Sequence, residues 1–371
     1  MPFLSPILRL PVAVGELLFG VSLVYLFKTF GINPEEFKLL DFLSFLGFSL
    51  LMFLAGLEID WDKLEELSPR EKLVISLVVF LNFLFGAAAV FLLKLPTQFV
   101  LLLGALGIGL MLSVLREIEI PEHTKQIILI TGSLGEIATL LGLTGYDIYL
   151  TFGLGKKFFV HLVWIALFGL AFVVLLKAIK FLIWYFPDKV ASLMAGENKA
   201  AVDIRASFAL MLLFMSFTSM VHIEPILGAF IAGTLLGFIF REKEQFESKL
   251  SALGYGFLIP FFFVQVGFHF DVTTVVKNLG ILTLAVVLLL TIPAVKLLST
   301  LPFLLVGFSF WEILLTALLF SFPFTILIAV GKILYEKGVW NSELFSLVIL
   351  LTILTGVVYP MAVKILFGSK R

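Results

Sequence analysis

The chain has 371 residues, of which 61% are hydrophobic and 14% charged, and its formal net charge at pH 7 is zero. A soluble domain of this length needs a far more polar surface, so the composition indicates an integral membrane protein. The zero net charge gives no sign of a nucleic-acid partner. The chain has no cysteine, which excludes disulfides and thiolate metal sites, and no cofactor is expected.

Runs of about 20 apolar residues are long enough to cross a membrane as helices. The chain contains twelve such runs. Each run is continuous rather than alternating, which predicts an all-α membrane protein and excludes a porin-like barrel. In chain order the predicted helices are 11–27, 40–57, 73–93, 97–115, 126–146, 158–184, 204–221, 225–240, 254–270, 279–300, 312–331 and 344–363.

The ends of the chain carry two further expectations. The first residues lack a basic segment followed by a small-residue cleavage site, so we expect a mature N-terminus rather than a signal peptide. The last predicted helix ends close to Arg371, so we expect residues 1–371 to form a single membrane domain without a soluble regulatory domain.

The loops on the side of the N-terminus hold about twice as many Lys and Arg residues as the loops on the opposite side. Lys332 is assigned to a loop on that opposite side. Positive charge is enriched in cytoplasmic loops. The distribution therefore predicts a multi-pass protein of the cell (inner) membrane with both termini in the cytoplasm.

An internal repeat links the start of the chain to its last third. The second and ninth predicted helices both end in Gly-x-x-x-Asp, at Gly56–Asp60 and Gly267–Asp271, and the first and eighth share a Pro and two Gly at nearly the same offset. Each partner lies seven helices further along the chain, an odd number of crossings, so the halves (about 8–150 and 222–367) are predicted to be inverted. Chance is the alternative, because Gly and Pro are common in membrane helices. Inverted repeats are typical of secondary transporters.

The same offset pairs the fourth predicted helix with the eleventh. The fourth contains three glycines around Gly107, followed by Ser113, and the eleventh contains Ser321, Pro323 and Thr325. Proline disturbs a helix interior, and paired broken helices often form transporter sites. We expect these two helices to be discontinuous and to cross. Glycines that ease helix packing and a single proline kink are the simpler alternative.

Two charges lie inside predicted membrane helices. Glu136 is the only charge between Lys125 and Asp147, and Lys296 is the only one between Lys277 and Glu312. A charge at this depth costs at least about 2.5–3.5 kcal/mol on insertion scales, so it indicates an ion pathway, a proton relay or a buried ion pair. The alternatives are a neutral structural glutamate and a lysine whose ammonium reaches the membrane surface.

Four segments, LPVAVGELLFGVSL, LMFLAGLEID, IEPILGAFIAGTLLG and LGYGFLIPFFFVQVGFHFDV, resemble in this order the sodium/hydrogen exchanger superfamily. They are most similar to its monovalent cation:proton antiporter-2 branch, which includes Kef-type proteins. The resemblance covers most of the chain. It implies a homodimer with a core domain, a dimerisation domain, two crossed discontinuous helices and elevator-like transport. It also implies a transporter of Na+ or K+ against H+ rather than an enzyme.

Within this resemblance Glu136 matches the ion-binding carboxylate and Lys296 matches its charge partner. Burial favours a protonated carboxyl and a nearby cation favours a charged one, so such a group can exchange the two ions. Ser133 and Thr131 are candidate oxygen ligands on the same helix. Their alternative is a hydrogen bond within the helix. Beyond a transported cation at Glu136, no metal site is expected.

The chain departs from the family pattern around this site. Gly135 replaces the polar residue that usually precedes the carboxylate, Leu106 and Gly107 stand where small polar residues are usual, and Pro323 lies where the family has charged residues. One carboxylate favours one-for-one exchange. A symporter of a solute or organic anion, and a non-transporting homologue that acts as a sensor or membrane partner, are the alternative functions.

Overall fold

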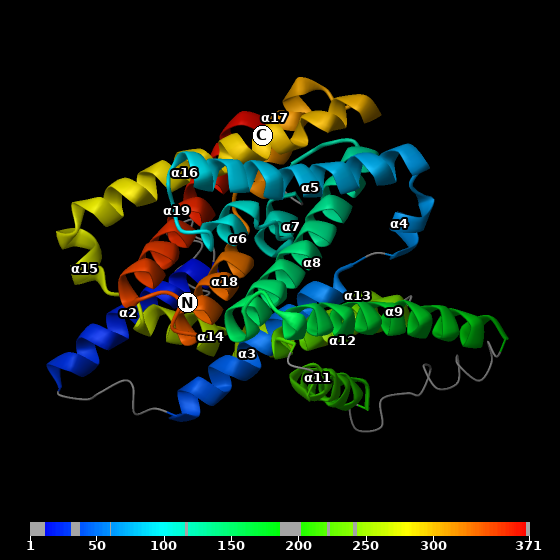
Figure 1. Ribbon diagram of the computed structural model, residues 1–371, viewed down its shortest axis with the longest axis horizontal. Coiled ribbons are helices and arrows are strands. Elements are labelled where there is room, and N and C mark those ends of the chain that lie inside the picture. Colours follow the sequence, from blue (N-terminus) through cyan, green and yellow to red (C-terminus); the bar gives the residue numbers. More distant parts are fainter. Residues whose placement is uncertain are drawn as a thin grey trace. The chain divides into compact units, whose positions relative to one another are not determined.

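The computed structural model describes residues 12–30, 38–59, 61–115, 118–185, 202–220, 223–239 and 243–368. Every regular element in these ranges is a helix (Figure 1). In chain order the helices are α2 (Val12–Thr29), α3 (Lys38–Leu57), α4 (Trp61–Glu66), α5 (Pro69–Leu92), α6 (Phe99–Gly104), α7 (Gly109–Leu115), α8 (Glu122–Phe152), α9 (Lys156–Tyr185), α11 (Val202–Met220), α12 (Pro225–Ile239), α13 (Lys243–Leu253), η2 (Gly254–Leu258), α14 (Ile259–Phe268), α15 (Val272–Lys277), α16 (Leu279–Thr300), η3 (Leu301–Val306), α17 (Phe310–Phe320), α18 (Phe324–Glu336) and α19 (Ser342–Phe367).

Seven helical stretches in the described residues are long and apolar enough to cross a membrane: Lys38–Leu57, Pro69–Leu92, Glu122–Phe152, Glu247–Phe268, Leu279–Val306, Phe310–Glu336 and Ser342–Phe367. Four shorter apolar helices join them: Val12–Phe27, Phe99–Leu112, Ile204–Met220 and Pro225–Phe238. Each predicted run overlaps a helix, which confirms the all-helical membrane class, while twelve crossings stay a prediction. Pro11 and Asp60, used in the repeat argument, lie outside the described residues.

The described chain forms two compact units. One contains the residues up to Asp41, from Asp62 to Leu140 and from Phe263 onward, and the other contains Phe42–Trp61 and Leu141–Phe262. Each unit draws on both predicted halves, so the halves are not separate compact bodies. The inverted duplication stays a prediction.

Two of the predicted helices are interrupted, and both belong to the first unit. Helix α6 ends at Gly104 and α7 begins at Gly109, while α17 ends at Phe320 and α18 begins at Phe324. Glycine is a weak helix former, which explains the first interruption. Pro323 has no backbone N–H and its ring clashes with the preceding turn, which explains the second.

Glycines bring α2 and α14 into close contact within the first unit. A Cβ added at Gly20 would collide with the carbonyl oxygen of Val264, and one added at Gly267 would collide with that of Leu17. Each helix therefore presses a glycine onto the backbone of the other, as small residues allow in membranes.

Helices α3 and α12 show the same arrangement within the second unit. A Cβ at Gly56 would collide with the carbonyl oxygen of Phe230, and one at Gly233 would collide with that of Phe53. These four residues lie 211 or 213 positions from their counterparts in α2 and α14. The matching contacts support the proposed repeat.

The structure corrects the assignment of Lys332 to a loop. Helix α18 continues to Glu336, and Lys332 is a buried residue of that helix with 8% of its surface exposed. Lys332 therefore does not count among the loop charges. Without it the loops opposite the N-terminus hold even fewer positive charges, so the predicted orientation is unchanged.

Candidate functional site

Glu136 lies in the middle of α8 and is completely buried. Its Oε2 accepts a hydrogen bond of 3.1 Å from the backbone N–H of Ile108, in the interruption between α6 and α7. Its Oε1 has no hydrogen-bond partner in the described part of the chain. A charged carboxylate in this position is costly unless a cation or proton neutralises it.

Glycines on α8 allow the interrupted helix to approach Glu136. A Cβ at Gly132 would lie 2.7 Å from Ile108 Cγ2, and one at Gly135 would lie 2.6 Å from Leu106 Cβ. The side chain of Leu106 thus fills the space that a side chain at position 135 would need. Gly135 and Leu106, the two positions singled out in the sequence, are therefore in direct contact.

Lys296 on α16 is also completely buried, which excludes the alternative that its ammonium reaches the membrane surface. Its Nζ donates to Asn82 Oδ1 at 3.0 Å and to the carbonyl oxygens of Leu103 at 2.9 Å and Ala105 at 2.6 Å. Among the described residues no ion pair joins Lys296 to Glu136. The structure therefore places the lysine on the backbone at the end of α6.

Asn82 on α5 is a buried polar residue that the sequence reasoning missed. Its Oδ1 accepts from Lys296, and its Nδ2 donates to the carbonyl oxygen of Gly104. The signal was present, because Asn82 is an isolated amide within the long apolar stretch 77–93. A buried amide in such a stretch requires partners.

The segment from Leu103 to Ile108, which contains the end of α6 and the interruption, thus connects the two charged residues. Its first carbonyl groups are bound by Lys296 and Asn82, while two of its N–H groups donate to side chains of α8. Besides the Ile108 bond to Glu136, the N–H of Leu106 donates to Thr139 Oγ1 at 3.4 Å. Lys296 and Glu136 therefore act on the same six-residue segment from its two ends.

The two interruptions lie against each other. A Cβ at Gly107 would be 3.4 Å from Pro323 Cβ, and one at Gly109 would be 3.7 Å from Thr325 Cγ2. Helices α6, α7 and α18 accordingly lie side by side (Figure 1). The Ser321 hydroxyl donates to its own helix at Ala317, 2.6 Å away. Ser113 lies in α7, and its side chain is outside the described residues.

Thr131 and Ser133 are buried on α8 near Glu136 in sequence. Thr131 Oγ1 donates to the Ile127 carbonyl at 2.7 Å, and Ser133 Oγ donates to that of Leu129 at 2.9 Å. Both hydroxyl protons are thus used within the helix. Hydroxyl oxygens keep acceptor lone pairs after donating, so a role as ion ligands stays a prediction.

A second cluster of polar side chains in the first unit surrounds Gln265, whose isolated amide in an apolar segment indicates a buried polar group. Gln265 Nε2 donates to Asp41 Oδ1 at 2.7 Å, Lys332 Nζ donates to Gln265 Oε1 at 3.2 Å, and Lys332 lies 3.7 Å from Glu336 Oε1. The amide thus links a carboxylate on α3 to the ammonium on α18. Because these residues are far apart in sequence, no local pattern indicates their meeting.

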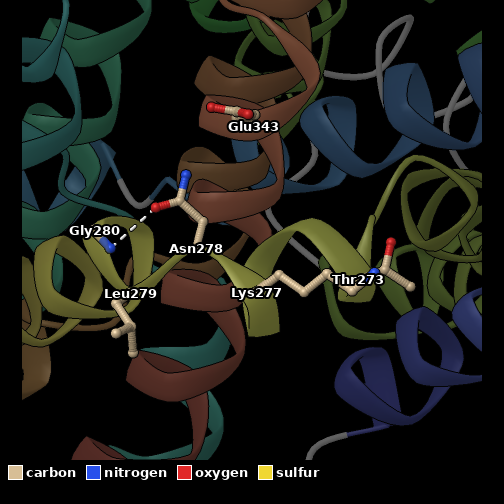
Figure 2. Close-up of a pocket in the computed structure, with 6 residues that line it drawn as sticks. All are labelled: Thr273, Lys277, Asn278, Leu279, Gly280 and Glu343. Atoms are coloured by element: carbon tan, nitrogen blue, oxygen red, sulfur yellow. Dashed lines mark hydrogen bonds between the residues drawn. The ribbon is translucent and has the colours of Figure 1, made fainter.

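An open cavity lies where α15 meets α16, lined by Thr273, Lys277, Asn278, Leu279, Gly280 and Glu343 (Figure 2). In Figure 2 Asn278 is bonded to Gly280, as expected of a residue that caps α16. Neither Glu136 nor Lys296 lines this cavity. Within the described ranges, no group of three or more His, Asp or Glu residues could hold a metal ion.

Comparison with known proteins identifies related chains. YjbQ of Bacillus subtilis is 27% identical over the whole of this chain, which spans 62% of the length of YjbQ. The Na+/H+-K+ antiporter GerN of Bacillus cereus is 26% identical, over 99% of this chain and 92% of GerN.

The solved structure of the sodium proton antiporter MjNhaP1 from Methanocaldococcus jannaschii has the same fold, with a TM-score of 0.62 and 15% identity over 97% of this chain and 91% of that one. The family model described as sodium/hydrogen exchanger, transmembrane, matches residues 1–368. This chain therefore belongs to the sodium/hydrogen exchanger family of transmembrane proteins.

Proposed function

We propose that this protein exchanges a monovalent cation, Na+ or K+, for protons across the membrane, and that Glu136 binds the two ions in turn. The observation that carries the proposal is the environment of this carboxylate. It is completely buried, one oxygen accepts a single backbone bond, and the other has no partner among the described residues. Such a group needs a proton or a cation to be neutral in the membrane.

The exchange follows from competition at one site. When Glu136 loses its proton, its oxygens are hard ligands for a monovalent cation, and Ser133 and Thr131 are proposed to add hydroxyl oxygens. When the proton returns, the carboxyl becomes neutral and the cation loses its main ligand. Lys296 is proposed to act as the charge partner through the interrupted backbone rather than by direct contact.

Several features of the transport cycle are part of the proposal. The facing interruptions around Gly107 and Pro323 are proposed to form the crossing at which the ion binds. Movement is proposed to be elevator-like, and the division of the described chain into two compact units supports this. We further propose a homodimer in the cell inner membrane with both termini in the cytoplasm, and the Kef-type branch stays a prediction.

The alternative of an organic-anion symporter is less well supported by the site. An ammonium has three N–H donors, and those of Lys296 already have three acceptors in Asn82, Leu103 and Ala105. No donor is left for an anionic solute in this state. The buried carboxylate instead favours a cationic substrate.

The proposal is tested by proton flux in proteoliposomes under an imposed pH gradient, with Na+, K+ or Li+ added. Native protein is expected to dissipate the gradient when its cation is present, and Glu136→Gln is expected to lose this activity. Glu343→Gln, at an exposed glutamate of α19, is the matched control and should behave as the native protein. Cation-dependent flux that survives in Glu136→Gln would refute the role of Glu136.

A further inference from the structure

Both the nitrogen and the oxygen of the Asn82 side-chain amide form hydrogen bonds, although the residue lies in the apolar part of α5. Nδ2 donates to the carbonyl oxygen of Gly104, and Oδ1 accepts from Lys296 Nζ at 3.0 Å. The side chain is completely buried. An amide has a donor and an acceptor at fixed positions, so a leucine or a carboxylate of similar size cannot make both bonds.

Asn82 and Lys296 together bind three consecutive carbonyl groups. Lys296 donates to the carbonyl oxygens of Leu103 and Ala105, and Asn82 donates to the carbonyl oxygen of Gly104, which lies between them. Carbonyl groups at the end of a helix have no intrahelical partner and need one from elsewhere, above all when buried. The two side chains therefore fix the backbone where α6 stops.

The same backbone reaches Glu136 a few residues later. Only Leu106 and Gly107 separate Ala105 from Ile108, whose N–H donates to Glu136 Oε2 at 3.1 Å. The N–H of Leu106 is bound to Thr139 in addition. A shift of the carbonyl groups on the Lys296 side therefore moves the donor that Glu136 uses.

We propose that Asn82 is a positioning residue for ion exchange. It holds the Lys296 ammonium on the α6 carbonyl groups, and the fixed interruption in turn presents the Ile108 N–H to the carboxylate. Asn82 touches neither ion and acts through Lys296 and the backbone. This inference rests on the proposed function of Glu136.

The first test compares the pH dependence and cation dependence of exchange in Asn82→Leu, Asn82→Asp and native protein. Asn82→Leu is expected to lower exchange about tenfold, with a raised apparent KM for the cation. In Asn82→Asp the new carboxylate neutralises the Lys296 ammonium, so the net positive charge beside the interruption is lost. The loss of a nearby positive charge favours a protonated carboxyl at Glu136, so half-maximal exchange should move to higher pH by roughly one unit. Ser76→Ala, at an exposed serine of the same helix that bonds Lys72, is the control.

A double-mutant cycle separates this role from a loss of folding. If Asn82 acts through Lys296, Asn82→Leu should change exchange less than twofold in a Lys296→Met background, as expected of coupled residues (about 0.5–3 kcal/mol of coupling). If Asn82→Leu lowers exchange by the same factor in the native and the Lys296→Met backgrounds, the two residues act independently and the inference is overturned. An unchanged pH profile in Asn82→Asp would also overturn it. Each variant is first shown to be monodisperse with a native-like thermal midpoint. Exchange lost in Glu136→Gln but normal in every folded Asn82 variant would refute this inference alone.

Discussion

Leu106 of the interruption packs against Gly135, the residue before Glu136 on α8. Leu106 occupies the space that a side chain at position 135 would need. A side chain at 135 would press on Leu106, because its Cβ would lie 2.6 Å from Leu106 Cβ. This contact therefore places an apolar side chain, rather than a polar ligand, against the residue before Glu136.

Gly135→Ala is expected to destabilise the protein by about 1–3 kcal/mol, because the added methyl overpacks a tight contact between α8 and the interruption. Leu106→Ala in the same chain should restore part of this loss. Thermal unfolding of the purified variants in detergent measures both effects. Equal unfolding midpoints for native protein and Gly135→Ala would show that the contact is not tight.

At the level of elements, the interruption between α17 and α18 depends on one proline. Pro323 removes a backbone N–H at this point, and its ring lies beside Gly107 of the other interrupted helix. The interruption keeps the backbone irregular next to the site of Glu136. Irregular backbone at membrane depth is tolerated where it is buried in protein or lines a cavity.

Pro323→Ala supplies the missing N–H and allows α17 to continue towards α18. We expect little loss of stability, since alanine is about 3 kcal/mol better than proline inside a helix, but a strong loss of exchange because the crossing is altered. Transport assays and thermal unfolding of the same preparation separate the two effects. Native exchange rates in Pro323→Ala would contradict a role for the interruption.

At the scale of the whole molecule, the glycine contacts of α2 with α14 and of α3 with α12 repeat one arrangement in the two units. The repeat predicts that the same substitution at equivalent glycines lowers the thermal stability of the protein by similar amounts. Gly20→Ala and Gly233→Ala should both lower the unfolding midpoint, because each added Cβ collides with a carbonyl oxygen. Gly145→Ala is the control, with nothing within 4 Å of the added Cβ. A large loss in only one of the pair would argue against equivalent roles.

Much of this architecture could be predicted from the sequence, because membrane helices are recognised by the length and hydropathy of their apolar runs. The interruptions followed from local residues, three glycines around Gly107 and the single Pro323. The contacts of Lys296 did not follow, since its partners Asn82, Leu103 and Ala105 come from distant segments. For the same reason the link between Gln265 and Lys332 was missed. Lys332 was placed in a loop because the predicted helix was ended at residue 331, where the uncharged run stops, whereas α18 continues to Glu336.

The most direct test of the account is proton release on cation binding by the purified protein in weakly buffered detergent solution. If Glu136 exchanges one ion for the other, adding Na+ or K+ near neutral pH should release about one proton per cation bound to the native protein. Glu136→Gln should release none, and Glu343→Gln should match the native protein. Equal proton release from native protein and Glu136→Gln would contradict the central claim that this buried carboxylate is the exchanging group.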